Sequence, residues 1–598
     1  MTRRRLFTSL AALLALSMLC TALVAWGTRG WSPDRGHYGS PDMDAWLRLT
    51  IVTQLYETGD WFNHKIDRYG VPDALETPWT RPLDMLLLAG ALPLSAFMPF
   101  KEALFLWATW LNPVLLSLSL LPLAAIARRL NLSALSILGC ALLFILSPFT
   151  QDSFAPGRAD HHGLLACCFL FWLRFLCDAG VRKYDLLAGM ALALGLWISP
   201  EFLVAGVAGL FWLGARWLKR GDRNLMQALA RICASATACA ALFLTLEYGA
   251  RGWGVLAYDT ISPVHVAVLA AGLAWGRGML RLPKPSIRAR LLAALTAVPL
   301  GGALLAIFPG LLHGPASAAD ALAWWHTRTY TPEAAPMRQL GDAPFVMFVT
   351  SCALAAIGWL AAMRDSAYRT GWLLIGLMAA LFAALALSML RWHAYAVPVL
   401  ALCIAGGLEA CRRHVPGGWA VRQPTAFALL VLCLMAGVAA AHVFAPGAPA
   451  RPEAVRQAAC RTQGLLAIRR NDFPPGNHVI LTLPFMLSTQ VPFWTPHASA
   501  LTWDYHRRAD GLIDLSTVTY AQTAEEAREV LRRHRVTLLM VCDALFVPYA
   551  DPQQKGQKPP RPFLDKLFAS DIPSWMTLLP RTQAQAQAGY YLFEIKEP

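Results

Sequence analysis

Long apolar blocks separated by short polar turns dominate the first three quarters of the chain. Many blocks are long enough to cross the roughly 30 Å hydrocarbon core of a bilayer as a helix. The pattern predicts about thirteen transmembrane helices. The expected spans are 6–26, 104–127, 132–149, 163–177, 186–198, 202–218, 225–246, 264–280, 291–312, 345–362, 372–389, 394–410 and 426–443.

Basic residues gather in every second turn between the expected spans, which sets the orientation. Cytoplasmic turns are enriched in Lys and Arg, so these turns should face the cytoplasm. A cleaved signal peptide is the alternative for 6–26, but the block is long and we interpret it as a retained helix with its N-terminus inside. The basic turns hold Arg128 and Arg129; Arg182 and Lys183; Lys219, Arg220 and Arg223; Lys284, Arg288 and Arg290; Arg364 and Arg369; and Arg412, Arg413 and Arg422.

One apolar block, 83–100, does not fit as a span. It contains Pro93 and Pro99, and a crossing there would place the turn of Arg128 and Arg129 outside. We expect an amphipathic or re-entrant segment at the outer surface. Residues 1–445 then form a membrane domain whose main outer loops are 27–103, 150–162 and 313–343.

The tail, 446–598, reads as a small extracytoplasmic α/β domain. Strand-like runs at 478–483, 536–541 and 590–594 alternate with helix-like stretches at 452–468 and 524–533. The predicted fold class is therefore membrane all-α with this appended domain. The expected location is the inner (plasma) membrane, multi-pass, with a periplasmic tail.

The composition supports a membrane protein, and the distribution of basic residues explains the high net charge without nucleic acid. The chain is 56% hydrophobic and only 15% charged, which excludes an ordinary soluble fold. The net charge of +15 sits in turns that would face anionic lipid, so we expect membrane lipid and no nucleic acid as a partner. Cys460 and Cys542, alone in the outer tail, are predicted to form a disulfide.

Four outer features could carry chemistry. Asp42 and Asp44 suit a hard divalent cation or, alternatively, a helix N-cap. The segment Arg158-Ala159-Asp160-His161-His162 could bind metal or move protons, or form a helix-end ion pair. Glu333 alone would be an ordinary solvated residue, and Arg391 either snorkels or binds phosphate.

Together these features place acidic residues and an arginine on one side of the membrane. A divalent cation neutralises charge that develops on a departing diphosphate, and an arginine binds its oxygens bidentately. We therefore expect Asp44, Asp160 and Glu333 to share one outer cavity, with Arg391 pointing into it. A lipid-linked diphosphate would lie at this interface.

The same motifs resemble the catalytic subunit of oligosaccharyltransferase, which has the GT-C glycosyltransferase fold. Asp44-Ala45-Trp46-Leu47 resembles the family's first-loop D-P-W-F motif, and Asp160 stands where the family has D-x-E. Thr331-Pro332-Glu333 with Pro336 is similar to its S-V-S-E or T-I-x-E motif. Met389-Leu390-Arg391 resembles its late arginine segment, and the order is collinear over about 25–445. The chain is identified as a divergent member.

The resemblance implies an inverting, metal-dependent transfer of a sugar or glycan from a polyprenyl-(di)phosphate carrier. Asp44, Asp160 and Glu333 would be the metal and catalytic carboxylates, with Mg²⁺ or Mn²⁺ as cofactor. Arg391, Arg158 and His162 would bind substrate. His162 replaces the motif's second acid, which favours softer ions than Mg²⁺.

The acceptor is the largest departure. The family's W-W-D-Y-G motif, which reads an Asn-x-Ser/Thr sequon, has only a partial counterpart in Trp503-Asp504-Tyr505. His497 and Tyr505-His506-Arg507-Arg508 are further candidates, with an ordinary polar surface as the alternative. We expect the acceptor to be a glycan, a lipid or another protein site.

Two other classes compete with the enzyme. A lipid or glycan transporter or flippase should bury ionisable residues near the bilayer midplane, often in broken helices. The nearest such feature, Pro200-Glu201, maps to the outer side. A non-catalytic scaffold would not need the acidic residues, so the pattern favours the enzyme.

Overall fold

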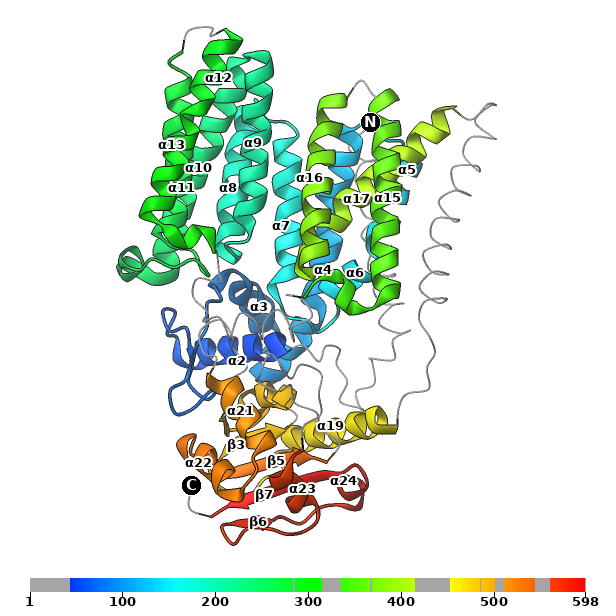
Figure 1. The fold of residues 1–598 in the computed structure, drawn as a ribbon. Helices are drawn as coiled ribbons and strands as arrows, with labels where there is room; N and C mark the ends of the chain where they lie inside the picture. The colour runs from blue at the N-terminus through cyan, green and yellow to red at the C-terminus, as the bar shows by residue number, and fades with distance from the viewer. Residues whose placement is uncertain are drawn as a thin grey trace.

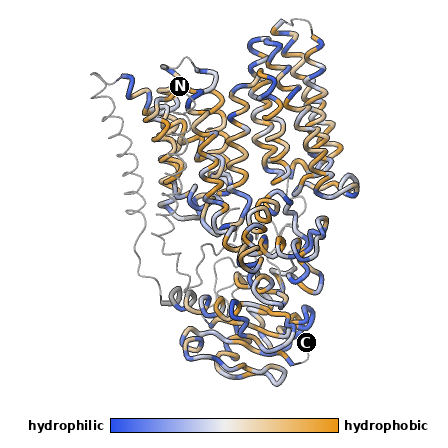
Figure 2. The backbone as a smooth tube through the Cα atoms, turned by 180° about the vertical axis from the view of Figure 1, so that it is seen from behind, coloured by the Kyte–Doolittle hydropathy of each residue, from blue (hydrophilic) through white to orange (hydrophobic). Residues whose placement is uncertain are grey.

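The computed structural model describes residues 43–282, 286–313, 335–365, 368–414, 452–483, 485–500, 510–543 and 560–596. A helical bundle stands above a smaller domain built on a sheet, and two short helices lie between them (Figure 1). Apolar residues follow the bundle helices, while polar residues gather at the ends of the bundle and over the smaller domain (Figure 2).

The bundle helices follow most of the expected spans. They are α4 (Phe100–Arg129), α5 (Ala134–Leu146), α6 (Pro148–Ser153), α7 (His161–Leu176), α8 (Arg182–Ile198), α9 (Phe202–Arg220), α10 (Arg223–Tyr248), α11 (Pro263–Met279), α12 (Ile287–Leu295), α13 (Ala297–Ile307), α15 (Asp342–Asp365), α16 (Arg369–Ser388) and α17 (His393–His414). Seven helical segments of the described residues are long and apolar enough to cross a membrane. The expected spans 6–26 and 426–443 lie outside the described residues, so the count of about thirteen stays a prediction.

Prolines divide two expected spans. The span 132–149 is two helices, because Ser147 before Pro148 is extended and ends α5 there. The span 291–312 is divided into α12, α13 and a 3₁₀ turn. Pro299, in the first turn of α13, has no N–H to continue the helix across Thr296.

Those basic turns that the structure describes lie at one end of the bundle, as their alternation predicts. Arg220 donates to Thr370 over 3.3 Å, and Arg413 donates to the carbonyl of Asn131 over 3.0 Å. This end points away from the sheet domain (Figure 1). By the positive-inside rule it would be the cytoplasmic end.

The segment before α4 forms two short helices and a hairpin. They are α2 (Met43–Thr58), β1 (Lys65–Ile66), β2 (Leu75–Glu76) and α3 (Arg81–Leu94). Asp84, fully buried, accepts from Arg48 at 2.9 Å and from Arg81 at 3.0 Å, which ties α2 to α3. The block 83–100 is thus a short helix and a turn between the bundle and the sheet domain, not a span.

The C-terminal domain contains the strands and helices expected of the tail. Its elements are α19 (Pro452–Arg470), β3 (Val479–Leu483), α20 (Val491–Trp494), β4 (Ala498–Ser499), α21 (Asp510–Tyr520), α22 (Ala524–Arg533), β5 (Leu538–Cys542), α23 (Pro562–Phe568), β6 (Met576–Leu578), α24 (Gln583–Gln587) and β7 (Tyr590–Ile595). The strand order is β4-β3-β5-β7-β6, with β4, β3 and β5 parallel and β7 antiparallel to both neighbours.

The predicted disulfide is confirmed. Cys460 of α19 is bonded to Cys542 at the end of β5, with a Cα–Cα distance of 6.0 Å. This bond connects the first helix of the tail to a central strand of its sheet. The geometry lies within the usual range for such bonds.

The segment between β1 and β2 joins the sheet of the C-terminal domain. Tyr69 forms a parallel bridge with Ser499 of β4. The Gly70 N–H donates to the Ser499 carbonyl, and the Ser499 N–H donates to the Arg68 carbonyl, both over 2.9 Å. Trp46 of α2 also contacts Trp494 of α20, with ring centroids 5.9 Å apart. The sheet domain therefore rests on the segment that carries Asp44.

Candidate active site

The loop between α6 and α7 lies at the bundle end that faces the sheet domain, and it is anchored on α4. Gly157, at φ +80°, turns the loop and donates to the Thr109 carbonyl over 3.1 Å. The Asn112 amide donates to the carbonyls of Ser153 and Arg158. A Cβ at Gly163 would lie 3.0 Å from Asn112 Oδ1, so glycine permits this close approach.

Asp160 caps α7 and is buried among cationic and imidazole groups. Its Oδ1 accepts from the His161 N–H over 2.6 Å and lies 2.7 Å from His161 Nδ1. Its Oδ2 lies 3.3 Å from His162 Nε2 and 3.6 Å from Arg158 Nη2. Only 3% of the Asp160 side chain is exposed.

The environment of Asp160 favours the ionised carboxylate. Burial alone would raise its pKa, but the charges of His162, His161 and Arg158 and the hydrogen bond from His161 outweigh burial. The pKa of Asp160 therefore lies well below its usual range. A charged carboxylate can hold a cation or orient a neighbouring imidazole.

Asp160, His161 and His162 together can hold a metal ion. One donor atom from each lies within 4.8 Å of the others. Asp160 Oδ2 is buried and makes no hydrogen bond within the described part of the chain. Two imidazoles and one carboxylate fit a borderline ion such as Zn²⁺ better than Mg²⁺ or Mn²⁺, which prefer oxygen ligands.

A polar chain joins this loop to the start of α17. Arg158 Nη1 donates to Asp152 over 2.8 Å, and Asp152 lies 4.0 Å from His393 Nε2. The same His393 nitrogen is 2.9 Å from the Ser153 hydroxyl. The loop before α7 and the turn that carries Arg391 are therefore held together.

Arg391 is oriented by a carboxylate from a third segment. It lies on the 3₁₀ turn Leu390–Trp392, with its Nε 3.8 Å from Glu201 Oε2. The Tyr395 hydroxyl donates to the other Glu201 oxygen over 2.8 Å. Arg391 and Arg158 both act electrostatically on His162, so the two arginines belong to one charged region.

The other two carboxylates of the expected set are placed differently. Asp44 lies half-buried in the first turn of α2 and is not part of the Asp160–His161–His162 group. Trp46, two residues further along α2, stacks on Phe105 of α4. Phe105 lies one turn before Thr109, whose carbonyl accepts from Gly157 in the loop that carries Asp160. Both segments therefore approach the same end of α4.

Glu333 lies outside the described residues. The described chain resumes at Ala335, whose carbonyl accepts from the Leu390 N–H over 2.9 Å. The expected common cavity for the three carboxylates stays a prediction. Ala335 adjoins the turn of Arg391, which keeps that prediction open to a direct test.

Three residues of the site did not emerge as candidates from the sequence. Glu201, Asp152 and His393 gain their roles from partners far along the chain. A signal existed for Glu201, which is an acidic residue in a short turn between two apolar helices. Asp152 and His393 carry no comparable local signal.

Comparison with known proteins identifies the fold. No protein-family model and no curated protein sequence matches this chain. The structure of oligosaccharyltransferase AglB from Archaeoglobus fulgidus, in complex with an inhibitory peptide and a dolichol-phosphate, matches with a TM-score of 0.64 at 13% identity. The match covers 90% of this chain and 70% of that one.

Two further structures of the Archaeoglobus fulgidus oligosaccharyltransferase agree. The complex with Zn and sulfate has a TM-score of 0.62 at 13% identity, covering 89% and 68% of the two chains. The form tethered to an acceptor peptide with an NVT sequon has a TM-score of 0.65 at 13% identity, covering 89% and 69%. The chain therefore has the fold of an oligosaccharyltransferase catalytic subunit, a GT-C fold, as its motifs predicted.

Proposed function

We propose that the chain is a membrane glycosyltransferase that moves a sugar or glycan from a polyprenyl-(di)phosphate carrier to an acceptor at the outer face of the membrane. One observation supports this most strongly. In an oligosaccharyltransferase fold, a buried Asp160–His161–His162 group lies in one charged region with Arg158 and Arg391, beside the sheet domain. The archaeal enzyme of similar fold was solved with a dolichol-phosphate, which is a carrier lipid of the proposed class.

The residues would have two roles, phosphate binding and cation binding. Arg391, held by Glu201, would bind the carrier's phosphate oxygens, and Arg158 would add positive charge beside them. Asp160, His161 and His162 would hold a divalent cation, with Asp44 and Glu333 as the further carboxylates of the proposal. When bound, such a cation neutralises charge that develops on the departing phosphate.

The distribution of charge weighs against a transporter. The buried carboxylates of the described helices lie close to helix ends, as with Asp160 before α7, Asp185 in the first turn of α8 and Glu247 in the last turn of α10. A transporter would place such groups near the bilayer midplane. Inverting stereochemistry, an inner-membrane location and a periplasmic sheet domain belong to the same proposal.

A lipid analysis followed by an enzyme assay tests the proposal. Cells that lack the gene should accumulate a polyprenyl-linked glycan, which is extracted and given to the purified full chain with membrane-protein acceptors. We expect wild-type protein to release the glycan from its carrier, and Asp160→Asn protein of equal folded content not to do so. Equal release by both proteins would contradict the assignment of the site. Movement of the lipid across vesicles without release would instead support a flippase.

We also propose that the acceptor is not an Asn-x-Ser/Thr sequon. The sequon-reading cluster of the family has only a partial counterpart at 503–505, which lies outside the described residues. A site built around the sequon hydroxyl rejects acceptors that lack it, so the two types of acceptor separate cleanly. Metal-dependent glycosylation of an Asn sequon peptide, but not of its Gln analogue, would contradict this proposal.

A further inference from the structure

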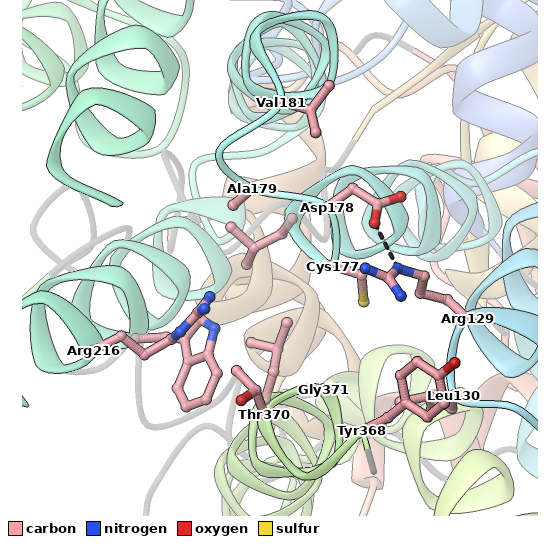
Figure 3. A pocket seen from close by; sticks show the side chains of 13 residues that line it. Arg129, Leu130, Cys177, Asp178, Ala179, Val181, Arg216, Tyr368, Thr370 and Gly371 are labelled. Atoms are coloured by element: carbon pink, nitrogen blue, oxygen red, sulfur yellow. Dashed lines mark hydrogen bonds and ion pairs between the residues drawn. The ribbon is translucent and has the colours of Figure 1, made fainter. Parts of the chain in front are cut away.

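A second cavity lies at the opposite end of the bundle, among the basic turns. Its volume is about 280 Å³, and it is lined from the end of α4, the turn between α7 and α8, α9 and the start of α16. Figure 3 shows Arg216 and Arg129 on opposite sides of it, with Asp178 and Tyr368 on the side of Arg129 and Thr370 between the two arginines. None of these residues belongs to the proposed transferase site.

The charge around this cavity is positive. Asp178 is the one carboxylate among its lining residues, and both of its oxygens are used. Oδ1 accepts from Arg129 and Oδ2 from Arg174, each over 2.6 Å. Two guanidinium groups thus share one carboxylate, which leaves one positive charge in excess before Arg216 is counted.

Arg216 contributes a further charge without a carboxylate partner among the described residues. Its guanidinium lies over the Trp212 ring, 5.5 Å from the centroid. Its Nε is buried and makes no hydrogen bond within the described part of the chain. A buried guanidinium N–H without a hydrogen bond is costly, and an anion in the cavity would satisfy it.

The rest of the lining points to a lipid. Leu130, Leu176 and Leu374 provide apolar walls beside the arginines. Phe211, next to Trp212, is 66% exposed on the surface of α9, where a bilayer would cover it. Tryptophan is enriched at membrane interfaces, and basic pockets between helices on the cytoplasmic side suit anionic headgroups.

We propose that this cavity binds the phosphodiester headgroup of an anionic glycerophospholipid from the cytoplasmic leaflet. The phosphate accepts hydrogen bonds from Arg216 and Arg129, and the glycerol and upper acyl chain lie against the leucines. The bound headgroup connects α4 and α7 with α9 and α16. This inference depends on the membrane orientation and not on the proposed transferase activity.

Native mass spectrometry of the full chain tests the proposal. The protein is taken from nanodiscs of phosphatidylcholine with or without phosphatidylglycerol, and the probe lipid is phosphatidylglycerol. We expect retention of phosphatidylglycerol over phosphatidylcholine, and about ten-fold weaker retention in Arg216→Gln. Arg216→Lys, which keeps the charge, should restore part of the binding.

Arg364→Gln is the matched control, because Arg364 is exposed near the same end of the bundle and does not line the cavity. It should retain phosphatidylglycerol like the wild type. Equal loss in Arg364→Gln and Arg216→Gln would show general surface attraction and overturn the proposal. Wild-type protein that retains both lipids equally would overturn it without any variant. Displacement of the lipid by inorganic phosphate at equal concentration would identify a free-phosphate site instead.

Discussion

Two buried carboxylates, one at each end of the bundle, differ in how their oxygens are satisfied. Asp160 and Glu409 are both 3% exposed, and both lie among cationic groups. Glu409 accepts from the Ser133 N–H at 3.1 Å, the Ser136 hydroxyl at 2.8 Å, and the guanidinium groups of Arg412 and Arg413. Its oxygens are saturated by the protein itself.

Asp160 is left incomplete by its own neighbours. Its Oδ1 accepts the His161 backbone N–H and lies 2.7 Å from His161 Nδ1. Its Oδ2 makes no hydrogen bond among the described residues, although His162 and Arg158 are close. A fully bonded carboxylate is typical of a structural link, whereas an unsatisfied carboxylate beside imidazoles is typical of a site that receives something else. The comparison therefore separates a residue that holds helices together from a residue that can act on a ligand.

The largest expected effect comes from removing the charge of Asp160, at the bundle end that faces the sheet domain. Asp160→Asn keeps the size of the side chain but loses the carboxylate, so transfer activity should fall by about 100- to 1000-fold. Release of glycan from the carrier lipid, per folded molecule, measures this. Activity within a factor of two or so of wild type would show that Asp160 is only a helix cap.

The matching change at Glu409, at the opposite end of the bundle, should act on stability instead. Glu409→Ala removes the partner of Arg412 and Arg413 and should lower the free energy of unfolding by about 2–3 kcal/mol, less than for a fully buried pair because both arginines reach solvent. Denaturant unfolding of the purified protein measures the loss. Activity per folded molecule should be unchanged, and a loss as large as that of Asp160→Asn would abolish the distinction between the two ends.

A change at Arg391 tests whether the site around Asp160 binds the carrier lipid. Arg391→Ala should weaken binding of the carrier lipid about ten- to thirty-fold, because a charge-assisted phosphate contact is lost, while metal affinity changes little. Equilibrium binding of the labelled lipid measures the first quantity, and calorimetric titration with the metal alone measures the second. Arg391→Lys, which keeps the charge without the bidentate geometry, should recover part of the affinity. Unchanged lipid affinity in Arg391→Ala would remove it from the site.

The smallest expected effect concerns the choice of metal. His162→Asp restores an oxygen ligand at the position where the family motif has an acid, so the ratio of Mg²⁺ to Zn²⁺ affinity should rise about ten-fold. Calorimetric titration of the chelator-treated protein with each ion gives that ratio directly. The same ratio in the variant and the wild type would exclude His162 as a ligand.

Elements with a local cause were predictable. The strand expected at 478–483 is β3, and the helix expected at 524–533 is α22. Both were predictable because the order of apolar and polar residues within each segment shows the period of its secondary structure. The disulfide followed from the placement of Cys460 and Cys542 in one outer tail. The boundaries near Pro148 and Pro299 were less accurate, since a long apolar block conceals a break that the proline imposes.

The candidate site was predictable only in part. Asp160, His162 and Arg391 could be selected because ionisable residues beside apolar spans are unusual. Their partners could not, since Glu201 meets Arg391 and Asp152 meets Arg158 and His393 only after the helices pack. Among the described residues, the group that could hold a metal ion contains His161 and not Asp44, and the expected set of Asp44, Asp160 and Glu333 stays a prediction.

The sequence alone determined where apolar blocks lie and which turns are basic. We predict insertion and sidedness from these two features, because transfer of a helix into lipid and the placement of its flanking charges depend on each segment's own composition. Only the tertiary structure decided that Asp160 would keep an unsatisfied oxygen while Glu409 would be saturated. Both are acids near helix ends, and their difference arises from which hydroxyls and guanidinium groups the packed helices bring within hydrogen-bonding distance.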